Sequence, residues 1–130
     1  MNEDQATLAI ISFLKSSWLA KTEISWDNID FKSTDNTPYI EPTITTVDSF
    51  SLSKSCLRNN CLLTIVVNTP KNTGINQGIK YSDDLLNLFV NKDAITGITF
   101  KSGRAQRLGP LGEWHRRRVL INFFYNQEIA

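Results

Sequence analysis

The sequence predicts an α+β fold in which a mostly antiparallel sheet of about six strands carries two helices on one face. Cys61 to Val67 is apolar at every position except Thr64, and its β-branched residues favour a strand covered on both faces. Two other segments have the apolar spacing of helices. The remaining strand signals are separated by short turns, which is typical of hairpins.

Length and composition indicate a single domain over residues 1–130. The chain is 41% hydrophobic and 21% charged, as is usual for a globular protein. Its 14 basic and 13 acidic residues give a net charge of +1, so any electrostatic role must be local. The N-terminus is acidic, and no apolar run approaches the length of a bilayer, so we expect neither secretion nor membrane insertion.

The first third of the chain predicts a helix followed by extended segments. Asn2 to Leu19 has the spacing of an amphipathic helix, with its asparagine as the cap. Glu23 to Phe31 alternates apolar and polar residues, which indicates two short extended pieces. After a polar loop at Lys32 to Thr37, we expect a strand from Tyr39 to about Leu52. Pro42 cannot donate to a ladder, so this strand is expected to begin at a sheet edge.

The middle of the chain predicts a hairpin and then the second helix. Ser53 to Asn60 is expected to turn at its final two asparagines and to return the chain into the central strand. We expect this segment and the loop at 32–37 to be poorly ordered in a free subunit. The loop at Asn68 to Gly74 lacks the Lys-Ser/Thr pair of a phosphate-binding loop, so a structural turn is expected. The apolar residues of the helix that follows, all expected to lie on the sheet, are Ile75, Ile79, Leu85, Leu86 and Phe89.

The last third of the chain predicts three more strands. Ile95 to Lys101 is the first, and Ser102-Gly103 is expected to turn the chain into the second, Arg104 to Leu108. Gly109 to Gly112 predicts a further break. Glu113 to Asn126 has the β-branched and aromatic content of one long final strand.

The two cysteines and the single histidine do not predict a metal site. Cys56 and Cys61 are separated by four residues, and His115 is far away in sequence, so one chain cannot assemble a zinc quartet. We interpret Cys61 as a core residue and Cys56 as a half-exposed loop thiol. Both are consistent with a reducing cytoplasm.

The order of these elements resembles a known family. An approach containing Trp26, the proline-flanked strand start at Tyr39 to Pro42, a loop from Pro70 to Gly74 before a helix, and Gly109 to Gly112 before Trp114 are similar to tail-terminator-like tail-completion proteins of long-tailed bacteriophages. The resemblance covers nearly the whole chain. It implies a hexameric ring that caps the tail tube, stops its growth and provides the head-joining surface.

The same resemblance implies the partners and the location. These are a tail-tube protein, a head-completion protein, and DNA that passes through the ring without sequence-specific binding. The protein would reside in the virion, at the head-proximal end of the tail, after assembly in the host cytoplasm. The resemblance implies no enzyme activity, no cofactor, no metal and no membrane. Another head-tail connector protein is the nearest alternative.

A hydrolase or nuclease is a second alternative, with few candidate groups. His115 has only Glu113 as an adjacent carboxylate to orient it as a base, and a surface histidine is the simpler interpretation. Asp83 and Asp84 are expected in the first turn of the second helix, where acidic residues are favoured by the helix dipole. This alternative requires Asp83, Asp84 and Glu113 to converge in one pocket.

A small nucleic-acid-binding module is a third alternative, because arginines gather late in the chain. Arg104, Arg107 and Arg116 to Arg118 lie beside Trp114 in sequence. A solvated hairpin end, balanced by Glu113 and Glu128, explains the same residues. The sequence leaves both interpretations open.

Alternation along the final strand predicts two different faces. We expect Val119, Ile121, Phe123 and Tyr125 to face the core. The opposite face mixes large apolar groups with arginines, which suits a contact with other subunits. Cover from another part of the same chain is the alternative for Leu120 and Phe124. With the preceding strand, the expected subunit or tube interface is Arg104, Arg107, Trp114, Arg116, Arg118, Leu120 and Phe124.

Overall fold

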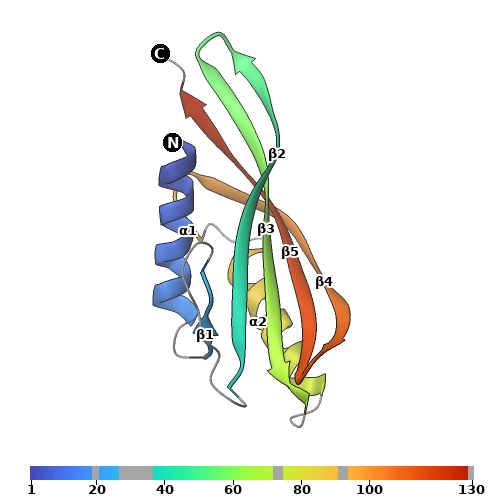
Figure 1. The fold of residues 1–130 in the computed structure, drawn as a ribbon. Coiled ribbons are helices and arrows are strands. Elements are labelled where there is room, and N and C mark those ends of the chain that lie inside the picture. The colour runs from blue at the N-terminus through green and yellow to red at the C-terminus, as the bar shows by residue number, and fades with distance from the viewer. Residues whose placement is uncertain (19–20, 27–36, 72–74, 91–93, 129–130) are drawn as a thin grey trace.

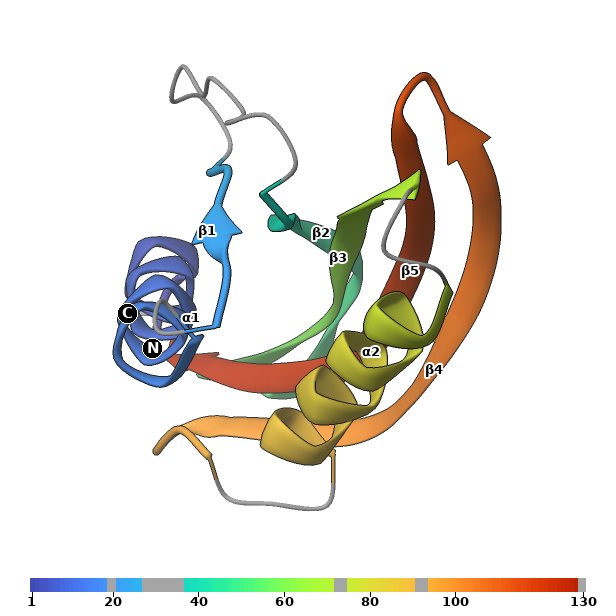
Figure 2. The same cartoon turned by 90° about the horizontal axis from the view of Figure 1, so that it is seen from below.

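One long, curved sheet with both helices on its inner side forms the molecule (Figures 1 and 2). The computed structural model describes residues 1–18, 21–26, 37–71, 75–90 and 94–128. Its elements, in chain order, are α1 (Glu3–Trp18), β1 (Glu23–Ile24), β2 (Tyr39–Ser53), β3 (Cys56–Pro70), α2 (Ile75–Phe89), β4 (Ile98–Leu111) and β5 (Trp114–Glu128). The α+β class with two helices is therefore confirmed.

The sheet has the strand order β1-β2-β3-β5-β4. The predicted central strand at Cys61 to Val67 is confirmed as the middle of β3, which has β2 on one side and β5 on the other. β1 joins β2 in parallel over two residue pairs, whereas the other three pairings are antiparallel. The sheet is thus mixed, and it has five strands in the described residues rather than about six. Residues 27–31, which were expected to be extended, lie outside the described residues.

The prediction of a turn at Ser102-Gly103 is wrong, and this explains the difference in strand count. β4 runs without a break from Ile98 to Leu111, with a register shift between Phe100 and Ser102. A Cβ added at Gly103 would lie 2.8 Å from Leu86 Cδ2 and 2.9 Å from Val90 Cγ2. The glycine therefore allows α2 to approach the strand closely. Close approach of another part of the chain is a common reason for a glycine inside a strand.

The predicted turn at Asn59-Asn60 is also wrong. The β2–β3 hairpin turns at Lys54-Ser55, because Ser53 pairs with Cys56. Asn59 is 4% exposed; its amide accepts a hydrogen bond from Ser49 Oγ at 2.5 Å and donates one to Gln127 Oε1 at 3.1 Å. Residues 56–60 are consequently paired strand rather than a loop. Residues 32–36 of the other predicted loop lie outside the described residues.

α1 has the cap that the sequence predicts, and Ile10, Leu14 and Trp18 are buried, but Leu8 is 62% exposed. Asn2 Oδ1 accepts a hydrogen bond from Gln5 N at 2.9 Å, and Gln5 Oε1 accepts one from Asn2 N at 2.9 Å, a reciprocal capping arrangement. Four residues at helical spacing pack on the sheet: Ala6, Ile10, Leu14 and Trp18. Their neighbours in the core are the helix-side residues of β3 and β5.

The buried side of α2 is rotated relative to the prediction. Leu85 and Phe89 are buried as expected, but Ile75 and Ile79 are 53% and 38% exposed. Gly78 and Ser82 take their place. The cause is Arg117, whose Nε donates to Ser82 Oγ at 3.0 Å and whose Cδ would lie 3.3 Å from a Cβ at Gly78. Small residues are needed there because an arginine stem lies between helix and sheet.

The predictions for the two cysteines and for the last turn are confirmed in part. Cys61 is 3% exposed in the core, as expected, and both cysteines are free thiols. Cys56 is half-buried, but it is the first residue of β3 rather than part of a loop. The break predicted at Gly109 to Gly112 is displaced, since β4 continues to Leu111 and the turn occupies Gly112-Glu113. Gly112 adopts a positive φ of 57° in that turn, a conformation that suits glycine.

Candidate interaction surface

We use the term open face for the side of the sheet that is turned away from both helices (Figure 2). The alternation predicted for the final strand is confirmed, because the four residues expected in the core are 0–3% exposed: Val119, Ile121, Phe123 and Tyr125. By that alternation the open face of β5 carries Trp114, Arg116, Arg118, Leu120, Asn122 and Phe124. β5 is an inner strand, so it offers this face and not its backbone to a partner.

Phe124 is held between two cations from neighbouring strands. The guanidinium carbon of Arg58 lies 4.1 Å from the centre of the Phe124 ring, and Lys101 Nζ lies 5.1 Å from it. Arg58 Nε also donates a hydrogen bond to Asn126 Oδ1 at 3.0 Å. Cations over an aromatic ring are attracted by its quadrupole, so the cluster positions two positive charges on the open face.

Arg118 and Leu120 lie next to this cluster along β5. Arg118 Nη2 donates to Gln106 Oε1 at 2.6 Å, and its buried Nε has no partner among the described residues. Leu120 is 8% exposed and lies at the base of a hollow of about 250 Å³ lined also by Leu62, Ser102, Gly103, Arg104 and Asn122. The same sheet therefore covers Leu120, whereas the rim of the hollow stays open and polar.

The β4–β5 end of the open face is aromatic. The rings of Trp114 and Tyr39 meet edge to face at 5.1 Å between centroids. Burial, and then the neighbouring Glu41 carboxylate, raise the pKa of Tyr39 above its ordinary value, while Arg116 acts in the opposite direction. Tyr39, a neutral tyrosine in edge-to-face contact with Trp114, thus lies close to Arg116 of the open face.

Arg107 does not join the other predicted interface residues. It pairs in register with Arg117, on the helix side of the sheet. There it lines a narrow crevice with Gly78 and Ile79 of α2 and with His115. Arg104 does join the open face, since it is opposite Leu120 in the ladder.

Sequence reasoning missed Arg58 and Lys101 as members of the open face. Arg58 was placed in a loop, and Lys101 was placed at a strand end. Only the register, which aligns Arg58 with Asn126 and brings Thr99 opposite Phe124, places both near the Phe124 ring. No sequence pattern around Arg58 indicates that it lies on the open face.

The carboxylates required by the hydrolase interpretation do not converge. Asp83 and Asp84 lie in the second half of α2 and not in its first turn, so the helix-dipole interpretation is wrong. Asp84 Oδ2 pairs with Lys21 Nζ at 3.4 Å, and Glu113 lies in the β4–β5 turn. Asp83, Asp84 and Glu113 line none of four surface hollows formed by the described residues. Within those residues, no group of three or more His, Cys, Asp or Glu side chains is arranged to hold a metal ion.

Neither helix in the described part of the chain combines the length and apolar character needed to cross a membrane.

Comparison with known proteins identifies the fold and no more. The chain matches no family model and no curated protein. Thirteen solved chains are similar in structure. One of them, whose name states no activity, superimposes with a TM-score of 0.65 at 14% sequence identity over 96% of each chain. At that identity the likeness extends to the fold of the whole chain and carries no information about its role.

Proposed function

We propose that this protein is a structural subunit of a phage or prophage virion that acts as a ring. The ring caps the tail tube, ends its polymerisation and provides the surface to which the head is joined. The proposal combines the motif order described from the sequence with one structural observation. That observation is the open face, which is broad, free of helices and carries arginines together with aromatic rings, with Arg58 lying over the ring of Phe124.

The composition of the open face supports a protein contact. Arginine and large aromatic residues are enriched where proteins bind one another, and they commonly carry most of the binding energy. Arg58, Phe124 and Lys101 form such a group across three strands. A solvated hairpin end, the other interpretation of the late arginines, does not require these cross-strand contacts.

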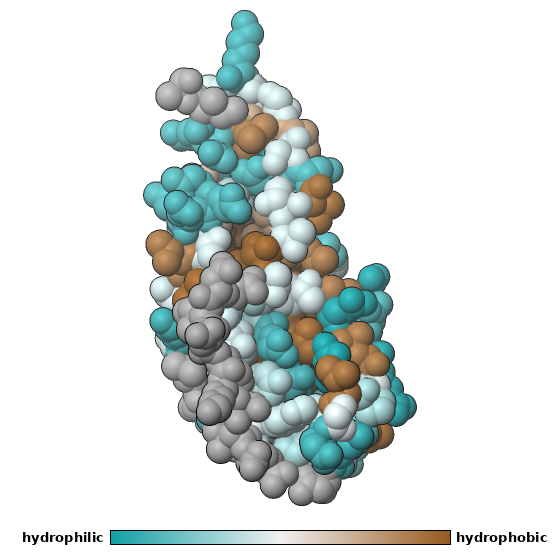
Figure 3. Space-filling model, in the orientation of Figure 1, coloured by the Kyte–Doolittle hydropathy of each residue, from teal (hydrophilic) through white to brown (hydrophobic). Residues whose placement is uncertain are grey.

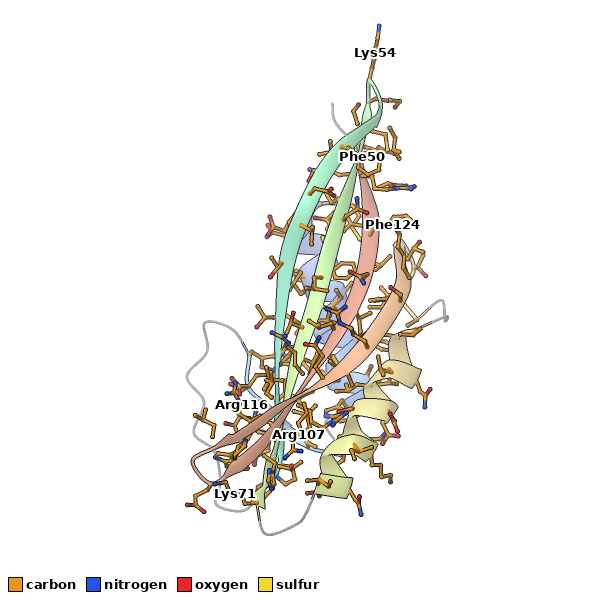
Figure 4. All side chains as sticks on the ribbon, turned by 90° about the vertical axis from the view of Figure 1, so that its right-hand side faces the viewer. Phe50, Lys54, Lys71, Arg107, Arg116 and Phe124 are labelled. Atoms are coloured by element: carbon orange, nitrogen blue, oxygen red, sulfur yellow. The ribbon has the colours of Figure 1, made fainter. Side chains whose placement is uncertain are left out.

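The β2–β3 hairpin supports the same function. It extends beyond both helices (Figure 1), with Phe50 and Lys54 near its tip (Figure 4). Three large apolar side chains on β2 are 44–64% exposed there: Val47, Phe50 and Leu52. A projecting hairpin with exposed apolar residues gains stability when a partner covers it.

The proposal involves no catalysis, no cofactor and no metal. Its partners are copies of the same chain, most simply in a hexameric ring, together with the tail-tube protein and the head-completion protein. DNA would pass through the ring without sequence-specific binding. Another head-tail connector protein would use the same open face, and the tube experiment below separates the two.

A small nucleic-acid-binding module is the second candidate function. Arg58, Lys101, Arg104, Arg116 and Arg118 lie on the open face or at its rim, and such a cluster attracts phosphates. Against it, Arg58, Lys101 and Arg118 are already engaged with Phe124 and Gln106.

Tail tubes that lack their natural cap test the proposed function. The purified protein should decorate one end of purified tubes in electron micrographs and should stop further addition of tube subunits. A connector that binds only after capping would leave bare tubes undecorated and still growing. The proposal is contradicted if the protein never decorates tube ends and stays monomeric in light scattering with and without tubes.

A further inference from the structure

The two outer strands of the sheet leave long backbone edges without a described partner. β1 pairs with β2 only at Tyr39 and Ile40, and Ser25 N donates to Ile40 O at 2.7 Å. From Glu41 to Ser53, β2 therefore has β3 as its one strand partner among the described residues. β4 likewise pairs with β5 alone in that part of the chain. Such edges present N–H and C=O groups that are able to pair with a further strand.

The two edge strands carry opposite charges. β2 contains Glu41 and Asp48 and no basic residue, which gives a charge of −2. β4 contains Lys101, Arg104 and Arg107 and no acidic residue, which gives +3. Pairing of two β2 edges, or of two β4 edges, would therefore bring like charges together. Pairing of β2 with β4 would bring opposite charges together, so the charges select a head-to-tail contact between copies.

The register of the sheet aligns these charges. Glu41 is level with Gln106, because both strands connect through Val66 of β3 and Arg118 of β5. Asp48 is level with Thr99 by the same route, through Asn60 and Phe124. Arg104 lies two residues from Gln106, and Lys101 lies two from Thr99. When copies are placed side by side without a stagger, each acid of β2 lies two residues from a base of the neighbouring β4. A stagger of two residues preserves the faces and brings either Arg104 opposite Glu41 or Lys101 opposite Asp48, depending on its direction.

A groove beside the β2 edge favours cover by another subunit. It measures about 490 Å³ and lies between α1 and β2, lined mainly by apolar side chains that include Leu8, Ile11, Trp26 and Ile44. Leu8 is 62% exposed. Figure 3 shows apolar atoms at the surface between these two elements. A second copy docked on the β2 edge would bring its α2, which covers the helix side of its own β4, towards this groove.

We propose that the β2 edge of one copy pairs with the β4 edge of the next, so that the sheet continues from subunit to subunit. β4 runs opposite to β2 within one sheet, so copies related by rotation about an axis along the strands pair in the antiparallel sense. Repeated head-to-tail contacts of this kind close into a ring when the rotation closes. This mode of assembly rests on the ring of the proposed function, but not on its attachment to a tube.

Charge-swapped variants test the edge pairing. E41K/D48K makes both edges basic, and K101E/R104E makes both acidic. We expect each variant alone to associate about a hundredfold or more weaker than the natural protein, because like charges are then opposed. An equimolar mixture, and the variant with all four changes, should recover assembly. Size-exclusion chromatography with light scattering, and native mass spectrometry, provide the measurement.

Matched variants control for net charge alone. E113K/E128K and K21E/K71E make the same changes in charge at exposed positions off β2, β4 and α2 and outside the groove, and we expect them to assemble like the natural protein. Circular dichroism checks that every variant is folded. The proposal is overturned if single-edge variants assemble normally, if the mixture fails to recover assembly, or if the natural protein stays monomeric at every concentration. Rings that follow the charge rules but leave tubes uncapped would contradict the proposed function and keep the edge pairing.

Discussion

Phe123 connects the sheet to both helices through a series of aromatic contacts. It is 1% exposed, and its ring centroid lies 5.6 Å from that of Phe100. Phe100 lies 5.0 Å from Phe89 of α2, which in turn lies 5.3 Å from Phe13 of α1. Phe123→Ala should therefore lower the free energy of unfolding by about 3–5 kcal/mol, through lost contacts and the cavity left behind. Urea denaturation followed by circular dichroism measures this loss.

Phe124 is the matched control, since it is the next residue and faces the other way. Its ring is half-buried under Arg58 and Lys101. Phe124→Ala should cost less than Phe123→Ala, at about 1 kcal/mol, because the ring is only partly buried and cation–π contacts at the surface are weak. Equal losses for Phe123→Ala and Phe124→Ala would contradict the assignment of the two faces.

Two buried acids give the direction of the pH dependence. Burial raises the pKa of the Cys61 thiol above 9.0 and that of the Tyr125 hydroxyl above 10.0. The unfolded chain then loses these protons at lower pH than the folded protein does, so the folded state binds more protons in this range. Stability is unaffected by these groups below their ordinary pKa values and falls as pH rises through them. Chemical denaturation at a series of pH values above about pH 8 measures the fall.

Cys61→Ala isolates the thiol in that pH series. We expect the variant to be less stable at neutral pH, because the side chain is 3% exposed in the core. Its stability should nevertheless decline less steeply as pH rises above the ordinary pKa of a thiol, since one titrating group has been removed. Identical slopes in the two proteins would show that the thiol remains protonated in both states, or that its ionisation is unaffected by folding.

At the residue scale, the sequence predicts which side chains of a strand share a face, because this depends only on the two-residue repeat of a strand. The alternation of Val119, Ile121 and Phe123 is correct because successive strand residues point to opposite faces whatever their neighbours are. Asn59 was misread, because an asparagine has a high turn propensity until its amide finds partners on adjacent strands. Those partners depend on the register, which no local pattern contains.

At the scale of one element, β5 has separate structural and interaction faces. Arg116 and Arg118 are half-buried on the open face, where they have no acidic partner in an ion pair among the described residues. Arg116→Glu with Arg118→Glu should therefore change the free energy of unfolding by less than about 1 kcal/mol. The same change should weaken assembly on tubes, because partner charges are then misaligned.

Thermal melts and tube-decoration counts measure the two effects of the arginine reversals separately. Lys21→Glu with Lys71→Glu alters the net charge equally at exposed positions outside the open face and the hairpin tip, and serves as the control. Reversals at Arg116 and Arg118 that unfold the subunit, while the folded remainder decorates tubes normally, would contradict the role given to the open face.

The elements themselves were predictable where their signals are long. α1, β2 and α2 have near-correct boundaries because periodicity extends over three or more turns or many strand residues. β3 was predicted in the right place but too short, since it extends beyond Cys61 to Val67 at both ends. β4 was divided in two because Gly103 has the local signature of a turn, whereas its cause is the approach of Leu86 and Val90. The α2 face was misjudged for a similar reason, since Arg117 is distant in sequence.

At the scale of the whole molecule, the sheet order was beyond sequence reasoning. β5 lies between β3 and β4, so β3 pairs with residues nearly sixty positions later in the chain. Local hairpin signals predict the β2–β3 and β4–β5 hairpins, but they do not predict which strands of the two hairpins lie next to each other in the sheet. The long free edges and the open face both follow from this order, which is why the sequence alone indicated the arginines of the candidate surface and missed its edges.

The balanced charge of the whole molecule leads to a prediction about DNA. The net charge is +1, with the basic residues of the open face offset by acids elsewhere. A ring through which DNA passes should bind a short duplex weakly, with a dissociation constant above about 10 μM at physiological salt and a steep loss of affinity as salt rises. Fluorescence anisotropy with two unrelated 20-base-pair duplexes measures this, and both should give the same curve. Arg116→Glu with Arg118→Glu should abolish the residual binding at low salt. Submicromolar binding that distinguishes the two duplexes would instead favour the nucleic-acid-binding module over the tail cap.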